Sequence, residues 1–194
     1  MCRYDVIAIG AGHAGIEAAC ASARMGQQTL LLTLKKDNIG AMSCNPAIGG
    51  VGKGQLVKEI DALGGVMARA ADACAIQFRV LNASKGAAVQ SSRAQIDMQM
   101  YNRYMKRRVA ARKNLSIKEA EVKKIIVEDN AVKGIITASG DKISASAVII
   151  CPGTFLNGLI HIGLKNFSGG RINEPAFCGL AQDLKELRFK MMRF

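Results

Sequence analysis

A glycine-rich turn between an apolar strand and a helical segment constrains the fold of this chain more than any other feature. The turn is Gly10-Ala11-Gly12-His13-Ala14-Gly15; it ends the apolar run 4–10 and opens an alanine-rich stretch over 13–25. A second apolar run follows at 29–33. Strand, helix and strand in this order predict a right-handed βαβ unit with parallel strands. The spacing Gly-x-Gly-x-x-Gly at this place is typical of dinucleotide-binding turns, because N–H groups at the helix start face a diphosphate.

Each glycine of the turn has its own expected task. Gly10 permits the tight turn, Gly12 lets the backbone approach a diphosphate, and Gly15 lets the helix pack closely on the strand. The second strand ends at Thr33 and is followed by two lysines, where such sites usually carry Asp or Glu for the ribose hydroxyls. Either the ribose is held from elsewhere or the adenosine end is held loosely. A glycine turn that binds nothing is the competing interpretation.

The rest of the chain predicts one α/β domain. Helices are expected over 55–63, 91–113 and 177–187, with a glycine-rich loop over 35–54. Strand patterns follow at 115–118, 122–128, 132–137, 143–150 and 188–194. The apolar run that ends at Ile150 is placed in the parallel sheet, and residues 115–142 are expected to form an inserted antiparallel β-meander. The expected fold class is α/β, with a Rossmann-like parallel sheet.

The six cysteines contain no Cys-x-x-Cys pair, so the sequence predicts no metal site and no thioredoxin-type site. Free thiols, the lack of a signal peptide and the lack of a membrane-spanning apolar run favour a cytoplasmic protein outside the membrane. Cys44 differs from the others because Ser43-Cys44-Asn45-Pro46 lies in the glycine-rich loop, with Lys53 not far along the chain. Both features favour a thiolate. A catalytic thiol and a structural cysteine remain alternative interpretations.

The chain is basic, with 27 Lys and Arg against 15 Asp and Glu and a net charge of +12. Most of the excess lies in residues 98–194, and such a surface attracts phosphates. The longest expected helix carries a run of basic residues: Arg103, Lys106, Arg107, Arg108, Arg112 and Lys113. A solvated helix face is the favoured interpretation of this run, and contact with phosphates is the second.

Several segments become specific when they are read together with the glycine turn. They are 43–50 (SCNPAIGG), 52–54 (GKG), 56–65 (LVKEIDALGG), 76–79 (IQFR), 81–86 (LNASKG), 93–95 (RAQ), 153–156 (GTFL), 160–163 (IHIG) and 168–171 (SGGR). In this order they closely resemble the MnmG (GidA) family of tRNA uridine 5-carboxymethylaminomethyl modification enzymes, over essentially the whole chain.

The resemblance implies an FAD-binding domain, with NADH as reductant and a methylene-tetrahydrofolate as one-carbon donor. The family works with the GTPase MnmE and as a homodimer, and it builds its group on C5 of the wobble uridine of tRNA. Carried onto this sequence, the resemblance implies that residues 10–15 hold the FAD diphosphate and that Val122 contacts the adenine side through its backbone. It also implies that Cys44 is one of two functional cysteines. A thiol that attacks C6 of uracil makes C5 nucleophilic, while the flavin handles hydride transfer.

The sequence departs from the family pattern in two respects. Asn173 and Phe177 stand where the family has Gly and a cofactor-contacting Ser. Family chains are also longer, so we expect residues 1–194 to be the N-terminal part of an FAD-binding domain. Two other hypotheses stay open. One is an FAD/NAD-dependent disulfide oxidoreductase, whose usual Cys-x4-Cys is absent here, and the other is a non-enzymatic basic nucleic-acid-binding module.

Overall fold

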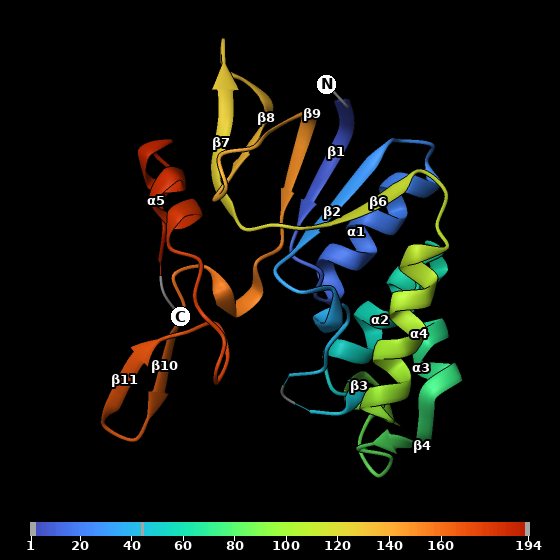
Figure 1. The fold of residues 1–194 in the computed structure, drawn as a ribbon. Coiled ribbons are helices and arrows are strands. Elements are labelled where there is room, and N and C mark those ends of the chain that lie inside the picture. The colour runs from blue at the N-terminus through green and yellow to red at the C-terminus, as the bar shows by residue number, and fades with distance from the viewer. Residues whose placement is uncertain (1–2, 44, 193–194) are drawn as a thin grey trace.

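A six-stranded mixed sheet forms the centre of the computed structural model, which describes residues 3–43 and 45–192. The strands lie in the order β6 (Leu115–Glu119), β2 (Thr29–Thr33), β1 (Arg3–Ile9), β9 (Lys142–Ile150), β8 (Ala131–Thr137) and β7 (Val122–Glu128). The first four pair in parallel, and β8 and β7 continue the sheet with antiparallel pairing (Figure 1). Helix α1 (His13–Arg24) joins β1 to β2, which confirms the expected βαβ unit and the α/β class.

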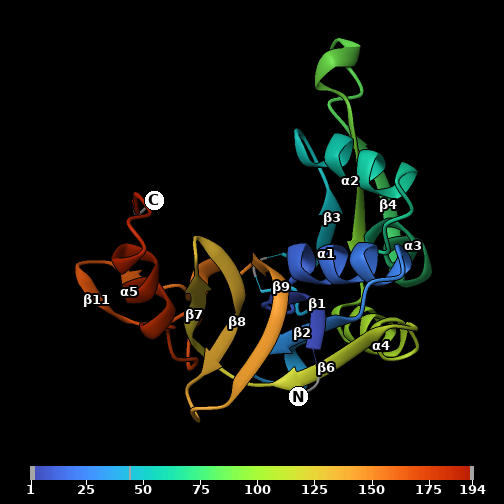
Figure 2. The ribbon, with the colours of Figure 1, turned by 90° about the horizontal axis from the view of Figure 1, so that it is seen from above.

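Alternate residues of the two central strands point into two separate cores. Ala8 and Leu31 pack with α1, α3 (Met67–Cys74) and α4 (Met98–Ala110). Their neighbours Ile7 and Leu30 lie in a second core with residues of β7, β8 and α5 (Gly179–Glu186). This alternation follows from the two-residue period of a strand. Figure 2 shows α5 beside β7 at one end of the sheet, α4 near β6 at the other, and α1 across the face of β1 and β2. Both faces of β1 and β2 are therefore covered, which explains their continuous apolar sequence.

A second, three-stranded sheet was not expected from the sequence. Its order is β3 (Ala47–Gly49), β5 (Ser91–Ile96) and β4 (Ala75–Leu81), with antiparallel pairing, and α2 (Lys53–Ala62) packs against it. The helix expected over 91–113 is therefore wrong in its first part. Residues 91–96 pair with strands on both sides, and α4 begins only after Asp97, whose carboxylate accepts a hydrogen bond of 2.9 Å from the Met100 N–H.

The antiparallel insertion is narrower than the expected span 115–142. Strand β6 pairs in parallel with β2, so it extends the Rossmann-like part of the sheet, and the antiparallel part consists of β7 and β8 with the adjoining β9. The final helix, α5, lies within the expected range 177–187. Residues 187–192 form a turn and backbone without strand pairing rather than the expected strand, whose last two residues, 193 and 194, lie outside the described residues. A hairpin of β10 (Leu159–Ile162) and β11 (Lys165–Ser168) was also missed.

Two side chains of α1, Glu17 and Arg24, contact the turn between α2 and α3. The Glu17 carboxylate accepts hydrogen bonds from the N–H groups of Val66 (2.9 Å) and Met67 (2.7 Å) at the start of α3. The Arg24 guanidinium donates to the carbonyl oxygens of Leu63, at 2.8 Å, and Gly64, after the end of α2. The carboxylate supplies acceptors to free N–H groups and the guanidinium supplies donors to free carbonyls. Helix α1 therefore fixes the turn between α2 and α3.

Candidate functional site

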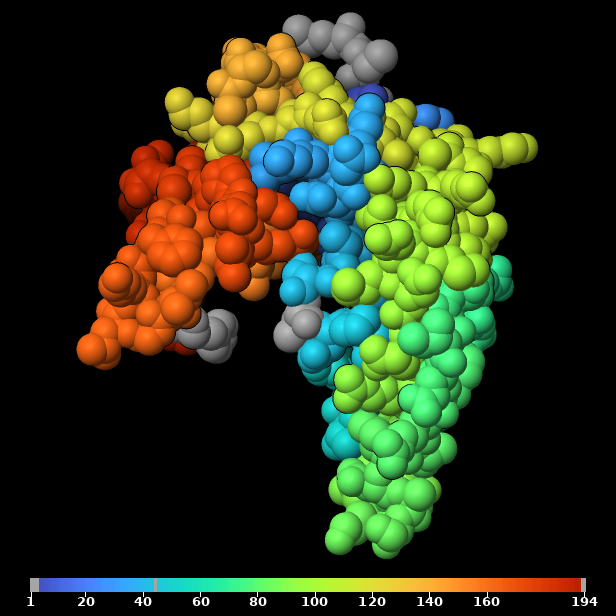
Figure 3. Space-filling view, turned by 60° about the horizontal axis from the view of Figure 1, so that its bottom comes forward, coloured from blue at the N-terminus to red at the C-terminus, as the bar shows by residue number. Residues whose placement is uncertain are grey.

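A cavity of about 260 Å³ lies at the carboxyl ends of β1, β2 and β9. Ligands of open α/β sheets bind at this edge. The surface is hollowed between the β10–β11 segment and the glycine-rich segment after β2 (Figure 3). The lining residues come from segments far apart in the sequence: 9–13, 32–35, 38, 41, 43, 120, 151–155, 171, 174 and 177.

The three glycines of the turn differ in the space around them. Gly10 has φ +103°, and a Cβ there would lie 2.2 Å from the Cys151 carbonyl oxygen. A Cβ on Gly15 would lie 1.7 Å from the Gly10 carbonyl oxygen, so this glycine is required for α1 to approach β1. Gly12 is extended and lines the cavity, and a Cβ there would meet nothing within 4 Å among the described residues. The turn is therefore closed on the protein side and open on the cavity side.

The N-terminus of α1 also carries features that suit an anion. Within residues 3–43 and 45–192, no side chain caps this helix and its first turn contains no acidic residue. The first N–H groups of a helix have no intrahelical partner, and the helix dipole adds a partial positive charge there. A diphosphate or another anion at the edge of the cavity would satisfy these groups.

His13 is positioned as a neutral contact residue. Burial lowers the pKa of its imidazole, and the nearby Arg171 cation lowers that pKa further. Its ring packs edge-to-face with the Tyr101 ring, at 5.7 Å between centroids. Within the part of the chain that the structure describes, His13 Nδ1 and the Tyr101 hydroxyl are buried without a hydrogen-bond partner. An imidazole in this environment does not carry charge at neutral pH, so it is a poor anion-binding cation.

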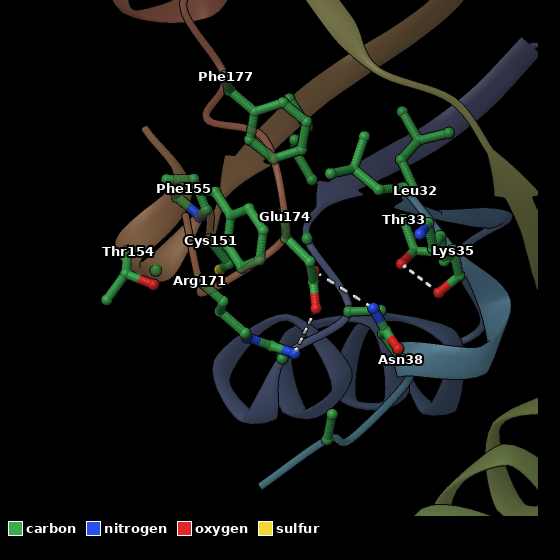
Figure 4. Close-up of a pocket in the computed structure, with 18 of the residues that line it drawn as sticks. Leu32, Thr33, Lys35, Asn38, Cys151, Thr154, Phe155, Arg171, Glu174 and Phe177 are labelled. Atoms are coloured by element: carbon green, nitrogen blue, oxygen red, sulfur yellow. Dashed lines mark hydrogen bonds and ion pairs between the residues drawn. The ribbon is translucent and has the colours of Figure 1, made fainter. Parts of the chain in front are cut away.

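The rim beyond β2 is arranged differently from a usual dinucleotide site. The Thr33 hydroxyl donates to the Lys35 carbonyl oxygen at 3.1 Å and is therefore engaged within its own turn. A carboxylate reaches the cavity from a distant segment instead. Glu174 Oε2 accepts a hydrogen bond from Asn38 Nδ2 at 3.3 Å, and its Oε1 lies 3.6 Å from Arg171 Nη1 (Figure 4). Sequence reasoning missed Asn38 and Glu174, and it used Arg171 only as part of the segment SGGR.

The two departures from the family pattern have different structural consequences. Asn173 adopts φ +64°, a left-handed conformation that asparagine tolerates better than most residues, so it can replace a glycine in this turn. Phe177 lines the cavity and packs against Phe155, with 5.8 Å between ring centroids. An aromatic ring therefore occupies the position at which the family pattern has a hydroxyl group.

Val122 and Cys44 are the two expected site residues outside the glycine turn, and the structure describes only Val122. Val122 is buried in the core together with Ile125 of the same strand, and Ala120 rather than Val122 is among the described residues that line the cavity. Its expected backbone contact with an adenine stays a prediction. Cys44 lies outside the described residues, although its neighbour Ser43 lines the cavity. Cys151 also borders the cavity, but burial raises the pKa of its thiol.

Within the described residues, no group of three or more His, Cys, Asp or Glu side chains could hold a metal ion. In the same part of the chain, no helix is long and apolar enough to cross a membrane.

Comparison with known proteins gives consistent matches. Residues 5–194 match the family described as Glucose inhibited division protein A. The tRNA uridine 5-carboxymethylaminomethyl modification enzyme MnmG of Thermodesulfovibrio yellowstonii is 56% identical over 190 residues, which cover 98% of this chain and 30% of that protein. The enzyme of the same name from Desulfotalea psychrophila is 57% identical over 181 residues, covering 93% and 28%. The crystal structure of GidA from Aquifex aeolicus is similar, with a TM-score of 0.94 at 52% identity over 99% of this chain and 32% of that one.

Two alanine substitutions should separate folding from ligand approach. In Gly15→Ala the new methyl group lies 1.7 Å from a backbone oxygen, so α1 must move away from β1. We expect a loss of about 3 kcal/mol in the free energy of unfolding, as for severe overpacking. In Gly12→Ala the methyl group enters open space, and the change should stay within about 1 kcal/mol. Urea unfolding followed by circular dichroism measures both; equal losses would contradict the assignment.

The neutral state of His13 predicts a pH dependence of stability. Because its pKa is lowered in the folded protein, the unfolded chain binds more protons below about pH 6.5, and stability falls as the pH falls. His13→Asn should therefore lose less free energy of unfolding than the wild type between pH 7.5 and pH 5.5. His161→Asn, at an exposed position, is the matched control and should behave like the wild type. Identical pH profiles for all three proteins would exclude the buried neutral imidazole.

Proposed function

The chain belongs to the Glucose inhibited division protein A family, and from that membership we propose that it is the FAD-binding part of an enzyme that modifies uridine in tRNA. Two relatives above 50% identity carry the name tRNA uridine 5-carboxymethylaminomethyl modification enzyme. The chain spans about 30% of the length of these curated relatives. The activity, substrates and partners of the whole protein are therefore proposals.

The observation that carries the proposal is the shape of the glycine turn. Gly10 and Gly15 are in close backbone contact with the protein, whereas Gly12 faces a cavity at the carboxyl edge of the sheet. Free N–H groups of the first turn of α1 border the same cavity. These residues fit a dinucleotide diphosphate, which needs close backbone approach and N–H donors. FAD is the dinucleotide that the family resemblance implies.

The residues of this chain would bind and orient the cofactor. The turn at 10–12 holds the diphosphate, and the rings of Phe155 and Phe177 give one wall of the cavity an apolar surface that excludes water. When bound, FAD supplies hydride transfer to or from a one-carbon unit. The proposal includes NADH as the reductant and a methylene-tetrahydrofolate as the one-carbon donor.

Cys44 is the proposed nucleophilic thiol of this part of the protein. The family resemblance assigns a functional thiol to this position, and Ser43, the residue before it, lines the cavity. In the proposed step, a thiolate adds to C6 of the wobble uracil and makes C5 a nucleophile toward the one-carbon unit. Loss of the C5 proton and departure of the thiolate then restore the uracil ring. The second functional cysteine of the family has no assigned position in this chain.

The basic face of α4 is the proposed contact with tRNA phosphates. Arg103 and Arg107 are exposed on this helix. Lys106 is paired with Asp37 at 2.8 Å, which ties the helix to the rim of the cavity after β2. Exposed guanidinium groups next to the site would attract the RNA backbone. The proposed assembly also contains the GTPase MnmE and a second copy of the whole protein, in the cytoplasm.

Reconstitution with FAD tests the cofactor proposal. The refolded chain with FAD should show a protein-bound flavin absorption band at about 450 nm, because the chromophore belongs to the cofactor. Gly12→Ala should weaken FAD binding by at least about tenfold, since the methyl group occupies the approach of the diphosphate. Gly86→Ala also adds a methyl group in open space, and it should bind like the wild type. A colourless wild-type protein would favour the basic nucleic-acid-binding module.

The thiol requires a test in a protein of the relatives' length. Cys44→Ser should keep the flavin and lose tRNA modification, measured by mass spectrometry of tRNA nucleosides. Cys178→Ser is the matched control, because Cys178 is an exposed cysteine on another segment, and it should retain activity. Full modification by the Cys44→Ser protein would remove this thiol from the mechanism.

A further inference from the structure

The missing acid at the end of β2 leaves the ribose side of the cavity without its usual partner. The cavity edge after β2 is formed by residues 32–35 and 38, none of which is acidic. A ribose diol offers two hydroxyl donors, and a carboxylate is the acceptor that dinucleotide sites use for them. The carboxylate closest to this edge in the cavity belongs to Glu174, which contacts Asn38.

The segment that carries Glu174 is held by close packing against Phe155 and by hydrogen bonds. Gly170 passes under the Phe155 ring so closely that a Cβ would lie 2.1 Å from it. The Thr154 hydroxyl donates to the Gly170 carbonyl oxygen at 2.7 Å. A tight turn follows, in which the Gly170 N–H donates to the Glu174 carbonyl oxygen (3.1 Å) and the Glu174 N–H to the Arg171 carbonyl oxygen (3.0 Å). Arg171 and Glu174 therefore project from one fixed turn.

Arg171 is positioned toward the diphosphate side of the cavity. Its guanidinium lies over the Phe155 ring, 5.1 Å from the ring centroid. Arg171 lines the same cavity as the glycine turn and His13, and its charge contributes to the lowered pKa of His13. The ion pair with Glu174 is 3.6 Å long, and both side chains are about one fifth exposed. The cation thus pairs with the acidic group and shares the cavity lining with the start of α1.

We propose that Glu174 is the ribose-binding acid of this site, in place of the residue that β2 lacks, with Arg171 as its positioning partner. The proposal rests on the proposed dinucleotide function. Its ligand class is the adenosine diphosphate half of a dinucleotide. The hydroxyls of the ribose donate to Glu174, which also accepts the hydrogen bond of 3.3 Å from Asn38. Arg171 pairs with the carboxylate and offsets its repulsion with the diphosphate.

The charges around the cavity support this arrangement. Lys35 borders the ribose side, and Glu174 is the one acidic side chain among the described residues that line the cavity. The two carboxylates nearby are engaged elsewhere, Asp37 with the Lys106 ammonium and Glu119 with the Lys36 N–H. Each carboxylate oxygen accepts more than one hydrogen bond, so Glu174 has capacity beyond its two present contacts. A carboxylate on a fixed turn loses little side-chain freedom when the diol binds.

Binding of ADP and of 2′,3′-dideoxy-ADP, measured by isothermal titration calorimetry on the 194-residue chain, tests the proposal. The wild type should prefer ADP by about tenfold, the value of a charge-assisted hydrogen bond. Glu174→Gln should reduce this preference to less than threefold, while its affinity for the dideoxy ligand stays within about twofold. Glu186→Gln, at an exposed position on α5, is the matched control and should keep the wild-type preference.

A second variant, Glu174→Asp, tests the proposal if the Glu174→Gln protein does not fold. Glu174→Asp keeps the charge and withdraws it by one methylene group, and it too should lose most of the preference for ADP. Arg171→Lys should weaken both ligands and also shrink the preference, because Glu174 loses its orientation. A preference retained in folded Glu174→Gln, or absent from the wild type, overturns the assignment of the ribose. Failure of the wild type to bind ADP or FAD at all overturns the proposed function as well.

Discussion

Direct backbone contact between β1 and α1 is the constraint on which the rest of the structure depends. Gly15 has no room for a Cβ because the Gly10 carbonyl oxygen lies where it would be, and Gly10 in turn lies against the carbonyl of Cys151. The start of α1 is thereby held at the carboxyl ends of β1 and β9. The free N–H groups of the helix point to the cavity as a consequence of this packing.

The same helix organises the part of the chain that follows. Glu17 and Arg24 contact the turn between α2 and α3, so the small sheet is connected to the helix that opens the cavity. On the other side of α1, Asn102 of α4 donates to the carbonyl oxygens of Asp37 (3.0 Å) and Ile39 (2.7 Å) in the rim. Helix α4 and the ribose side of the cavity are thus connected, because the Asn102 side chain contacts the backbone of residues 37–39.

The sequence could predict those parts of the fold in which local pattern and tertiary structure agree. The apolar strands, the glycine turn and α1 were predicted because burial on both faces leaves an uninterrupted apolar run. Residues 91–96 were assigned to a helix because they precede a strongly helical segment without a glycine or proline to mark the boundary. Only pairing with β3 and β4 makes them a strand, and that pairing joins residues distant in sequence. The parallel partner of β6 was missed for the same reason.

The amino-acid sequence by itself determined the βαβ unit, the open position at Gly12 and the excess of positive charge, because each depends on neighbouring residues. Tertiary structure alone decided which carboxylate faces the cavity. Glu174 is separated from β2 by most of the chain, and only the close passage of Gly170 under Phe155 brings it to Asn38. A side chain delivered by such packing has no periodic or spaced signal in the sequence, since the contact depends on the shapes of surfaces that form only on folding.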